Sequence, residues 1–372
     1  DQSAAFDCID HEILVNRLRQ TFGVTGKALN WIRSYLNGRS SFVHYSNASS
    51  NTSPVEAGVP QRSALGPYLF SMYIAPLSNV IRSFGINHHQ YADDTQLYIT
   101  VLKDDVLSCL CRLESSINAV HKWLSQNWLS LNPKKSEAIQ FTSGRGQSRV
   151  EDIASIAVSG VRIKPSTVVK SLGVTLDGGL TFDQHIANVC KASYFHIRAL
   201  RHVRKSLPDD VAKTVACSIV GSRIDYCNAL LVGMSDSNFA KLQRVQNTLA
   251  RVVLGLRKFE HITPALIELH WLPVKQRVTF KLATLTMKTI HSGQPTYLRD
   301  LVNAYEPVRT LRSSSQHLLC VGRTRTVTAA RSFRHSSATI WNSLPAEIRD
   351  CTAVDNFKRK LKTHLFKLAF AA

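Results

Sequence analysis

The sequence predicts an α+β fold in which a mixed region of strands and helices precedes a region built almost entirely of helices. Residues 1–182 alternate short apolar runs, turn residues and amphipathic stretches. From residue 183 onward, apolar residues recur mainly at steps of three and four, which is the period of a helix. We therefore expect three parts, namely residues 1–182, a helical region at 183–257, and a basic helical extension at 258–372.

The front part divides into elements that the local pattern predicts one by one. In order, we expect helices over 10–20 (capped by Asp10) and 26–37, two short strands within 40–61, one buried helix over 65–83, a hairpin over 90–98, a helix over 104–127, and a strand after the turn at Asn132-Pro133. The stretch "VVKSLGVTLDGGLTF" predicts a second hairpin with Gly178-Gly179 at its turn, because paired glycines favour tight turns.

The back part predicts helices over 183–205, 209–227, 236–257 and 274–291, and a basic, Ser/Thr-rich loop over 307–337. The last helix, 355–370, begins with Asp355 as a candidate cap. One face of it carries Phe357, Leu361, Leu365 and Leu368. Such a helix binds nucleic acid, lies on a membrane surface, or packs on its own protein, and the last case is the commonest.

The positive charge of the chain is concentrated in its back part. Residues 1–150 hold 14 Lys and Arg against 11 Asp and Glu, whereas residues 151–372 hold 32 against 15, and the whole chain has a net charge of +20. An excess of this size favours a polyanionic partner such as nucleic acid over simple solubilisation of helices. No run of eighteen apolar residues is present, so no membrane span is expected.

The eight cysteines form no CxxC pair, so neither a zinc site nor a disulfide framework is expected, and reduced thiols fit best. The first residues, "DQSAAFDCID", lack the basic and apolar regions of a signal peptide. The abrupt start without Met suggests that an N-terminal part is missing.

Carboxylates are the residues most suggestive of chemistry. Asp93 and Asp94 stand together at the tip of the expected hairpin, and Asp1 precedes Phe6 in "DQSAAFD". Carboxylates from two strands can hold two divalent cations that assist a phosphoryl displacement. An exposed Asp-Asp turn with no function is the better explanation of "ADD" when it is seen alone, because Asp is common in turns. An aspartic protease is not indicated, because its Asp-Thr/Ser-Gly setting is absent.

Five motifs in order resemble the reverse transcriptases of LINE-type, non-LTR retrotransposons, in particular the jockey-like group. They are "DQSAAFDCIDH", "GVPQRSALGPYLF", "YADD", "NWLSLNPKKSEAIQF" and "VVKSLGVTLDGGLTFDQHI". Near the C-terminus, "LHWLPVKQRV" and "WNSLPAEIRD" also resemble this group. The resemblance implies a right-hand polymerase palm, with an antiparallel sheet, packed helices and partial fingers, in residues 1–182. A helical thumb at 183–257 and the C-terminal extension would follow.

The resemblance also implies site residues. Asp1 and Asp93 would hold two Mg²⁺ ions, for which Mn²⁺ could substitute, and Asp94 would support them. Phe6 would be a steric gate that selects dNTPs, although a core phenylalanine is the alternative.

Three further contacts are implied on the same grounds. Gln61 would contact the incoming nucleotide or the template, and Lys135, with Lys134 as the competing choice, would lie near the triphosphate. Both have simpler explanations as polar loop residues. Tyr91 would pack under the turn or touch the primer end.

Leu172 and Gly173 would place the primer strand, although a plain hairpin is the alternative. The implied activity is RNA-directed DNA polymerisation, with an RNA template, a DNA primer and dNTPs as partners, no membrane, and the nucleus and cytoplasm as locations. A fingers region and an endonuclease would be missing upstream.

Two features depart from the family pattern. Family members usually carry glycine where this chain has Arg62, and a bulky residue at a position that requires glycine brings strain. Ala64 replaces a β-branched residue, which is a milder change. Arg62 and the abrupt start favour, as the main alternative function, a catalytically inactive relic that retains only nucleic-acid binding, and a two-metal nuclease is a more distant alternative.

Overall fold

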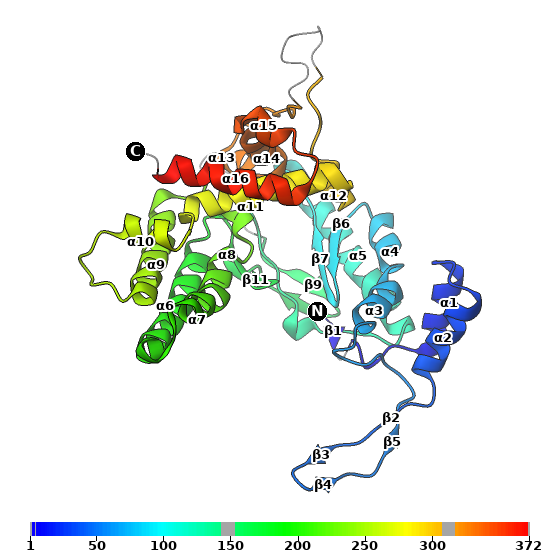
Figure 1. Cartoon of the computed structure of the whole chain (residues 1–372). Helices are drawn as coiled ribbons and strands as arrows, with labels where there is room; N and C mark the ends of the chain where they lie inside the picture. Colours follow the sequence, from blue (N-terminus) through cyan, green and yellow to red (C-terminus); the bar gives the residue numbers. More distant parts are fainter. Residues whose placement is uncertain (1, 4, 143–152, 307–316, 371–372) are drawn as a thin grey trace. The chain divides into compact units, whose positions relative to one another are not determined.

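The computed structural model describes residues 2–3, 5–142, 153–306 and 317–370 (Figure 1). The chain divides into two compact units. Unit 1 comprises 1–140 and 145–167, and unit 2 comprises 141–144 and 168–372. Helices and small antiparallel ladders occur together in the described chain, so the predicted α+β class is confirmed. The division into palm, thumb and extension stays a prediction.

The helices of unit 1 largely follow the predicted order. They are α1 (His11–Gln20), α2 (Gly26–Leu36), α3 (Gly66–Ile74), α4 (Leu77–Ser83) and α5 (Val106–Gln126), with short 3-10 helices η1 (Lys103–Asp105) and η2 (Pro133–Lys135). The Asp10 carboxylate accepts from the Ile13 amide at 2.8 Å, so the predicted cap of α1 is confirmed. The single helix expected over 65–83 is wrong. It breaks before α4 because Pro76 has no N–H to continue the ladder.

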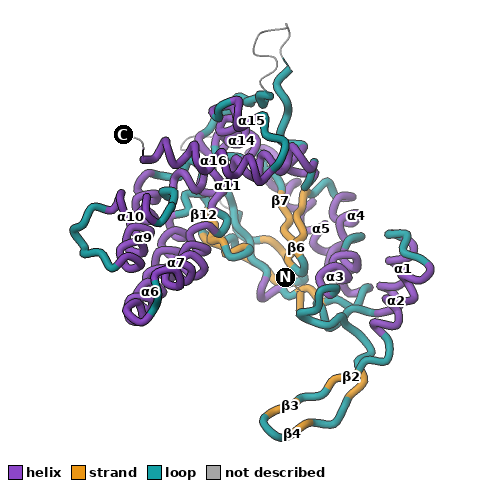
Figure 2. Tube along the Cα trace, in the orientation of Figure 1, coloured by secondary structure: helices purple, strands orange, loops and turns teal. Residues whose placement is uncertain are grey.

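The strands of unit 1 pair two by two instead of forming one sheet (Figure 2). The antiparallel pairs are β1 (Gln2–Ser3) with β8 (Ser130–Leu131), β2 (Ser40–Ser41) with β5 (Ser53–Pro54), β3 (His44–Tyr45) with β4 (Ala48–Ser49), β6 (Asn87–Tyr91) with β7 (Asp94–Tyr98), and β9 (Ile156–Val158) with β10 (Val161–Ile163). Residues 40–61 therefore hold four very short strands instead of two. The strand expected after Asn132-Pro133 is reduced to one bridge between Ile139 and Ser166.

One apolar core holds unit 1 together. Its largest fully buried side chains include Tyr73 and Phe70 of α3, Leu14 and Leu18 of α1, and Leu124 of α5. The Tyr73 hydroxyl donates to the carbonyl of Asn127 at 2.8 Å, which satisfies the only polar group that this ring buries. The core thus fixes the helices that flank the hairpin β6–β7.

In the described part of unit 2, the hairpin of β11 (Val168–Ser171) and β12 (Val174–Asp177) is followed by helices, and one isolated bridge joins Ala304 to Leu319. The helices of this unit are α6 (Asp183–Val203), η3 (Arg204–Ser206), α7 (Asp209–Ala216), the π-type turn η4 (Cys217–Gly221), α8 (Ser222–Asp225), η5 (Asn228–Leu231), α9 (Asp236–Leu254), α10 (Ile262–Glu268), α11 (Val274–Ser292), α12 (Thr296–Arg299), α13 (Val327–Ala330), α14 (Phe333–Ser343), α15 (Ala346–Arg349) and α16 (Val354–Phe370). None of the helices in the described ranges is long and apolar enough to span a membrane.

Two predictions for unit 2 are wrong in part. The turn of its hairpin lies at Leu172-Gly173, where both residues have positive φ, and Gly178-Gly179 follows β12 instead. The loop expected over 307–337 contains α13 and the start of α14, while its first part, 307–316, lies outside the described residues.

The C-terminal helix α16 packs on α11 in a core of its own. Phe357, Leu361 and Leu365 are buried there, as the stripe predicted. Leu368 is 66% exposed, so the stripe ends one turn early. Asp355 lies inside the helix, where its carboxylate binds Lys358 at 3.0 Å, and the cap assigned to it is wrong. This arrangement is that of a helix docked on its own protein.

Candidate functional site

The β6–β7 hairpin presents two adjacent carboxylates at its tip. Its ladder runs from Asn87 opposite Tyr98 to Tyr91 opposite Asp94, so that Ala92 and Asp93 make the turn. Asp93 and Asp94 are both half-exposed. The predicted hairpin is confirmed, and both charges are open to solvent instead of being enclosed in a sheet.

The turn of this hairpin holds a non-glycine residue in the left-handed region. Ala92 has a φ of 52°, a conformation that costs free energy for a residue with a Cβ and persists only where the surroundings impose it. One such restraint is the hydrogen bond from the Ser78 hydroxyl of α4 to Oε1 of Gln90, at 2.7 Å. Tyr91 is 68% exposed, so it does not pack under the turn.

The loop after Asp1 is fixed by the start of the "GVPQ" motif. The Gly58 amide donates to the Ile9 carbonyl at 2.7 Å, and the Val59 amide donates to the Phe6 carbonyl at 2.9 Å. A Cβ on Gly58 would lie 2.9 Å from the carbonyl oxygen of Asp7, and its φ is 88°. Glycine is thus required both by the close approach and by the backbone conformation. The two motifs, about fifty residues apart, form one structure.

Phe6 has features of both roles that the sequence allowed, a core phenylalanine and a steric gate. Its ring stacks on buried Phe70, with centroids 4.6 Å apart and planes inclined by 24°. The side chain is only half-buried, so it is anchored in the core and still partly open. An aromatic ring held in this way keeps a fixed position.

Gln61 is tied to a residue whose contact the sequence did not predict. Its Nε2 donates to both carboxylate oxygens of Asp7, at 2.9 and 3.0 Å, although both side chains are exposed. Asp7 belongs to the first motif, but its contact with Gln61 becomes visible only when the two loops are brought together by the fold. The pair fixes the direction of the Gln61 amide.

Arg62, which follows Gln61, has a φ of 60°. The position therefore does adopt the conformation that favours glycine, as the departure from the family pattern indicated. Beside it, Ser63 accepts from the Gly66 amide at 2.9 Å and donates to the Pro60 carbonyl at 2.7 Å, which closes a tight turn. The strain at Arg62 is held in place by this turn.

Lys134 and Lys135 are exposed on η2. The amide of Lys134 donates to the Asn132 side chain at 3.1 Å, which sets the turn that carries both lysines. Just before it, Leu131 of β8 pairs with Gln2 of β1. The lysine turn therefore lies a few residues from the ladder that contains the neighbour of Asp1. Asp1 itself lies outside the described residues.

The carboxylates of the hairpin tip fit a hard divalent cation in donor type, because carboxylate oxygens are the ligands that Mg²⁺ prefers. In the described ranges, no three His, Cys, Asp or Glu side chains gather closely enough to hold a metal ion. Neither β6 nor β7 pairs with β1 among the described strands. Asp93 and Asp94 are thus two candidate ligands, and the third that the sequence predicts is Asp1.

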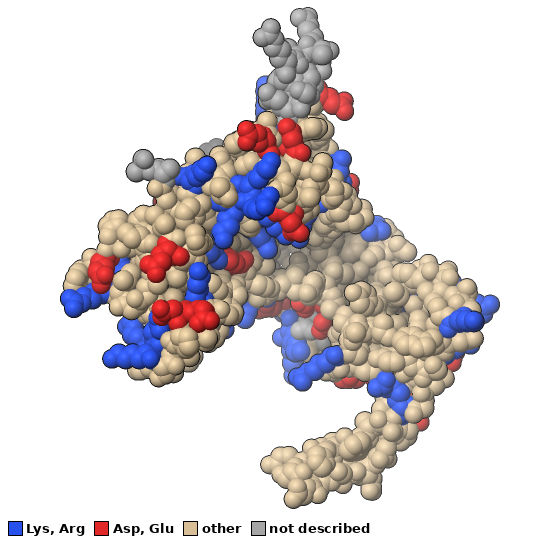
Figure 3. Space-filling model, in the orientation of Figure 1, with Lys and Arg blue, Asp and Glu red and all other residues tan. Residues whose placement is uncertain are grey.

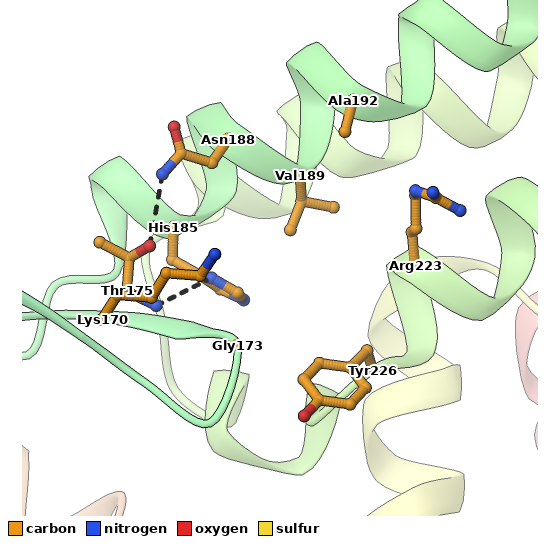
Figure 4. Close-up of a pocket in the computed structure, with 9 residues that line it drawn as sticks. All are labelled: Lys170, Gly173, Thr175, His185, Asn188, Val189, Ala192, Arg223 and Tyr226. Atoms are coloured by element: carbon orange, nitrogen blue, oxygen red, sulfur yellow. Dashed lines mark hydrogen bonds between the residues drawn. The ribbon is translucent and has the colours of Figure 1, made fainter. Parts of the chain in front are cut away.

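In unit 2, a cleft of about 430 Å³ adjoins the β11–β12 hairpin (Figure 4). Lys170 of β11 and Arg223 of α8 line it, together with Tyr226. The Tyr226 hydroxyl donates to the Leu172 carbonyl at 2.6 Å, and its ring would lie 3.1 Å from a Cβ on Gly173. The hairpin turn is thereby fixed against the helical part of unit 2. The sequence did not indicate Lys170, Arg223 or Tyr226.

His185 of α6 also lines this cleft. Its Nδ1 accepts from the Thr175 amide at 3.3 Å (Figure 4). Burial lowers the pKa of His185, because the charged imidazolium loses its hydration. Asn188 donates to the Thr175 hydroxyl at 3.3 Å, so α6 holds β12 through two side chains.

The junction between β12 and α6 is held by a charged side chain from far along the sequence. The Arg331 guanidinium donates to the carbonyl of Val232 at 3.0 Å and to that of Leu180 at 2.8 Å. It also lies over the Phe182 ring, 5.3 Å from the centroid. The Asp177 carboxylate accepts from the Phe182 amide at 2.8 Å. The segment after α13 therefore fixes the start of α6.

Comparison with known proteins gives a consistent result. Residues 1–176 match the family described as "Reverse transcriptase (RNA-dependent DNA polymerase)". The chain is 27% identical over 265 residues to "Probable RNA-directed DNA polymerase from transposon BS" of Drosophila melanogaster, a match that covers 68% of this chain and 28% of that protein. It is 27% identical over 198 residues to "RNA-directed DNA polymerase from mobile element jockey" of the same species, covering 52% and 20%. The chain is 25% identical over 277 residues to "Probable RNA-directed DNA polymerase from transposon X-element" of Drosophila melanogaster, a match that covers 70% of this chain and 28% of that protein. These matches span less than a third of each relative's length.

Proposed function

We propose that the chain, whose residues 1–176 match the reverse transcriptase family, carries the polymerising part of an RNA-directed DNA polymerase of a jockey-like, non-LTR mobile element. The reaction joins the 3′-hydroxyl of a DNA primer to the α-phosphate of a dNTP on an RNA template and releases pyrophosphate. The same proposal places the protein in the nucleus and the cytoplasm.

The observation that best supports this function is the hairpin tip with Asp93 and Asp94, within the segment that matches the family. The two acidic residues are consecutive at the tip, and both side chains are partly exposed. Their mutual repulsion is unfavourable unless cations or a solvent shell offset it.

Asp93, Asp94 and Asp1 would hold two Mg²⁺ ions. When bound, the ions supply electrostatic stabilisation of the attacking and leaving oxygens. The carboxylates would orient the site, and the primer hydroxyl would pass its proton to water as it attacks. Lys135, which is exposed on η2, would donate a proton to the leaving pyrophosphate.

Phe6 and Gln61 would contact the nucleotide. The Phe6 ring is fixed by Phe70, and a rigid aromatic edge excludes a ribose 2′-hydroxyl better than a mobile one. Gln61 is directed by Asp7. Both contacts depend on preorganised positions, which lower the entropy lost when substrate binds.

A polymerase that has lost its activity is the second candidate, and Arg62 is the observation that favours it. A long cation at a left-handed position next to Gln61 obstructs the place where a glycine lets the backbone approach a template base. Nucleic-acid binding would survive, because the net charge of +20 is unaffected.

Primer extension on poly(rA)/oligo(dT) with Mg²⁺ tests the proposal. Incorporation is expected to fall to background in Asp93→Ala and to persist in Asp104→Ala, which removes an exposed carboxylate of the same unit. If the chain alone shows no incorporation, the assay is repeated with Arg62→Gly in a longer chain that includes the upstream fingers. An absence of incorporation in that longer chain contradicts polymerase function and supports the inactive candidate. Release of nucleotides from labelled RNA without dNTPs would instead indicate a nuclease.

A further inference from the structure

The outer face of α2 carries a stack of flat side chains that nothing described so far uses. Trp31 and Tyr35 lie with their ring centroids 5.8 Å apart and their planes inclined by 11°. The guanidinium of Arg39 lies over the Tyr35 ring, 5.2 Å from its centroid. Leu29 and Leu36 fill the buried face of the helix and Tyr35 packs against the same core, whereas Trp31 is not part of that core. Trp31 is 57% exposed.

The segment of chain that holds this stack carries charge of one sign. Residues 13–55 contain no Asp or Glu and five Lys or Arg. Arg17 is turned inward, where it binds the side chain of Asn127. Arg19, Lys27 and Arg33 are exposed. A polyanion therefore meets cations and no repelling carboxylate along this stretch of the chain.

Beyond α2, residues 39–55 form an arm that extends away from the helices of unit 1 (Figure 1). Every residue from 40 to 54 is exposed. Phe42 and Tyr45 are 60% and 80% exposed. In the space-filling view the arm shows neither basic nor acidic side chains over most of its length (Figure 3). It offers aromatic rings together with Ser and Asn groups that can donate hydrogen bonds.

We propose that this surface, made of α2 and the arm, binds single-stranded RNA. Aromatic faces stack on unpaired bases whatever their identity, and cations nearby neutralise the phosphates. A duplex offers no free base faces, so a single strand is the matching ligand. A protein partner would find no carboxylates with which to pair its basic residues. The choice of RNA over other single strands rests on the proposed function.

The test measures binding of the whole chain to fluorescein-labelled U12 by anisotropy, without Mg²⁺ or dNTPs. Trp31→Ala is expected to weaken binding about tenfold, since stacking on one base contributes that order of affinity. Trp128→Ala is the matched control, because Trp128 is also exposed in unit 1, and it should leave binding within twofold. Arg39→Gln should reduce the slope of log affinity against log salt by about 0.7.

A second measurement does not depend on the alanine variant folding. U12 should quench the tryptophan fluorescence of the parent chain. In Trp31→Phe the part of the quenching that comes from Trp31 should be lost, while most of the affinity for U12 is kept. Equal affinities of the parent and Trp31→Ala, or unaltered quenching in Trp31→Phe, overturn the proposal. So does tighter binding of a U12/A12 duplex or of dT12.

Failure of the surface can be told apart from failure of the polymerase. Asp93→Ala should bind U12 as the parent does, because the hairpin tip is not part of the surface. A chain that binds RNA through Trp31 but extends no primer keeps this inference and loses only the proposed function.

Discussion

The amide of Gln61 donates two hydrogen bonds to the carboxylate of Asp7, at 2.9 and 3.0 Å. The two residues are 54 positions apart. Their contact joins the loop after Asp1 to the loop that carries Arg62. An exposed pair of this kind fixes a direction more than it adds stability, because water competes for both partners.

A double-mutant cycle of Asp7→Ala and Gln61→Ala should therefore show a small favourable coupling, about 0.5–1.5 kcal/mol in the free energy of unfolding. Urea unfolding of the four chains measures it. A coupling indistinguishable from zero would mean that the two side chains do not remain paired in solution.

Replacing Arg62 by glycine should stabilise the fold. Its φ of 60° costs a residue with a Cβ about 1–2 kcal/mol, and glycine returns part of this gain through its larger unfolded-state entropy. A net increase of about 0.5–1 kcal/mol in the free energy of unfolding is expected. Ala64→Gly, in the same turn but without positive φ, should lower it instead. Equal effects of the two variants would contradict the assignment of strain.

Arg331 should be far more important for stability than its neighbour Arg334. Arg331→Ala leaves the carbonyls of Leu180 and Val232 without this donor and uncovers Phe182, so a loss of about 2–3 kcal/mol is expected. Arg334→Ala changes an exposed side chain and should cost less than about 0.5 kcal/mol. Thermal unfolding of both variants measures the two losses of stability. A similar loss in each would contradict the stabilising role assigned to Arg331.

The stability of the fold should fall as His185 takes up a proton. Burial lowers its pKa in the folded chain below the ordinary value of 6.5, so the unfolded chain is protonated first as the pH decreases. The stabilisation is complete above about pH 7.5 and is lost progressively as the pH falls through 6.5 toward the folded pKa. His185→Gln should flatten this dependence between about pH 7.5 and 5.5 in urea titrations. His88, whose pKa burial also lowers, contributes the same sign, so the difference between variant and parent is the quantity to compare.

Local patterns predicted much of the fold. The long helix α5, the cap at Asp10 and the hairpin with Asp93 and Asp94 each follow from periodicity or turn chemistry within a few residues. The break at Pro76 was also readable, because proline cannot continue a helix, but the apolar run on both sides concealed it.

Other features depend on partners that are remote in sequence. Gly178-Gly179 has the stronger local signal for a turn, yet the turn forms at Leu172-Gly173, where Tyr226 holds the Leu172 carbonyl. The contacts of Gln61 and Arg331 likewise join segments that no local pattern connects. In the candidate site, residue types could be predicted, and their mutual positions could not.

The close contact between the backbones of Gly58 and Asp7 affects how the loss of activity in substituted variants of this chain is interpreted. A saturation screen scored by activity would mark position 58 as intolerant, next to true ligand positions, although Gly58 has no side chain to offer a substrate. Any Cβ there pushes on the backbone of Asp7 and displaces Phe6 and Gln61 with it. Such a screen cannot separate residues that act from residues that only leave room, whereas a parallel screen for folded protein can.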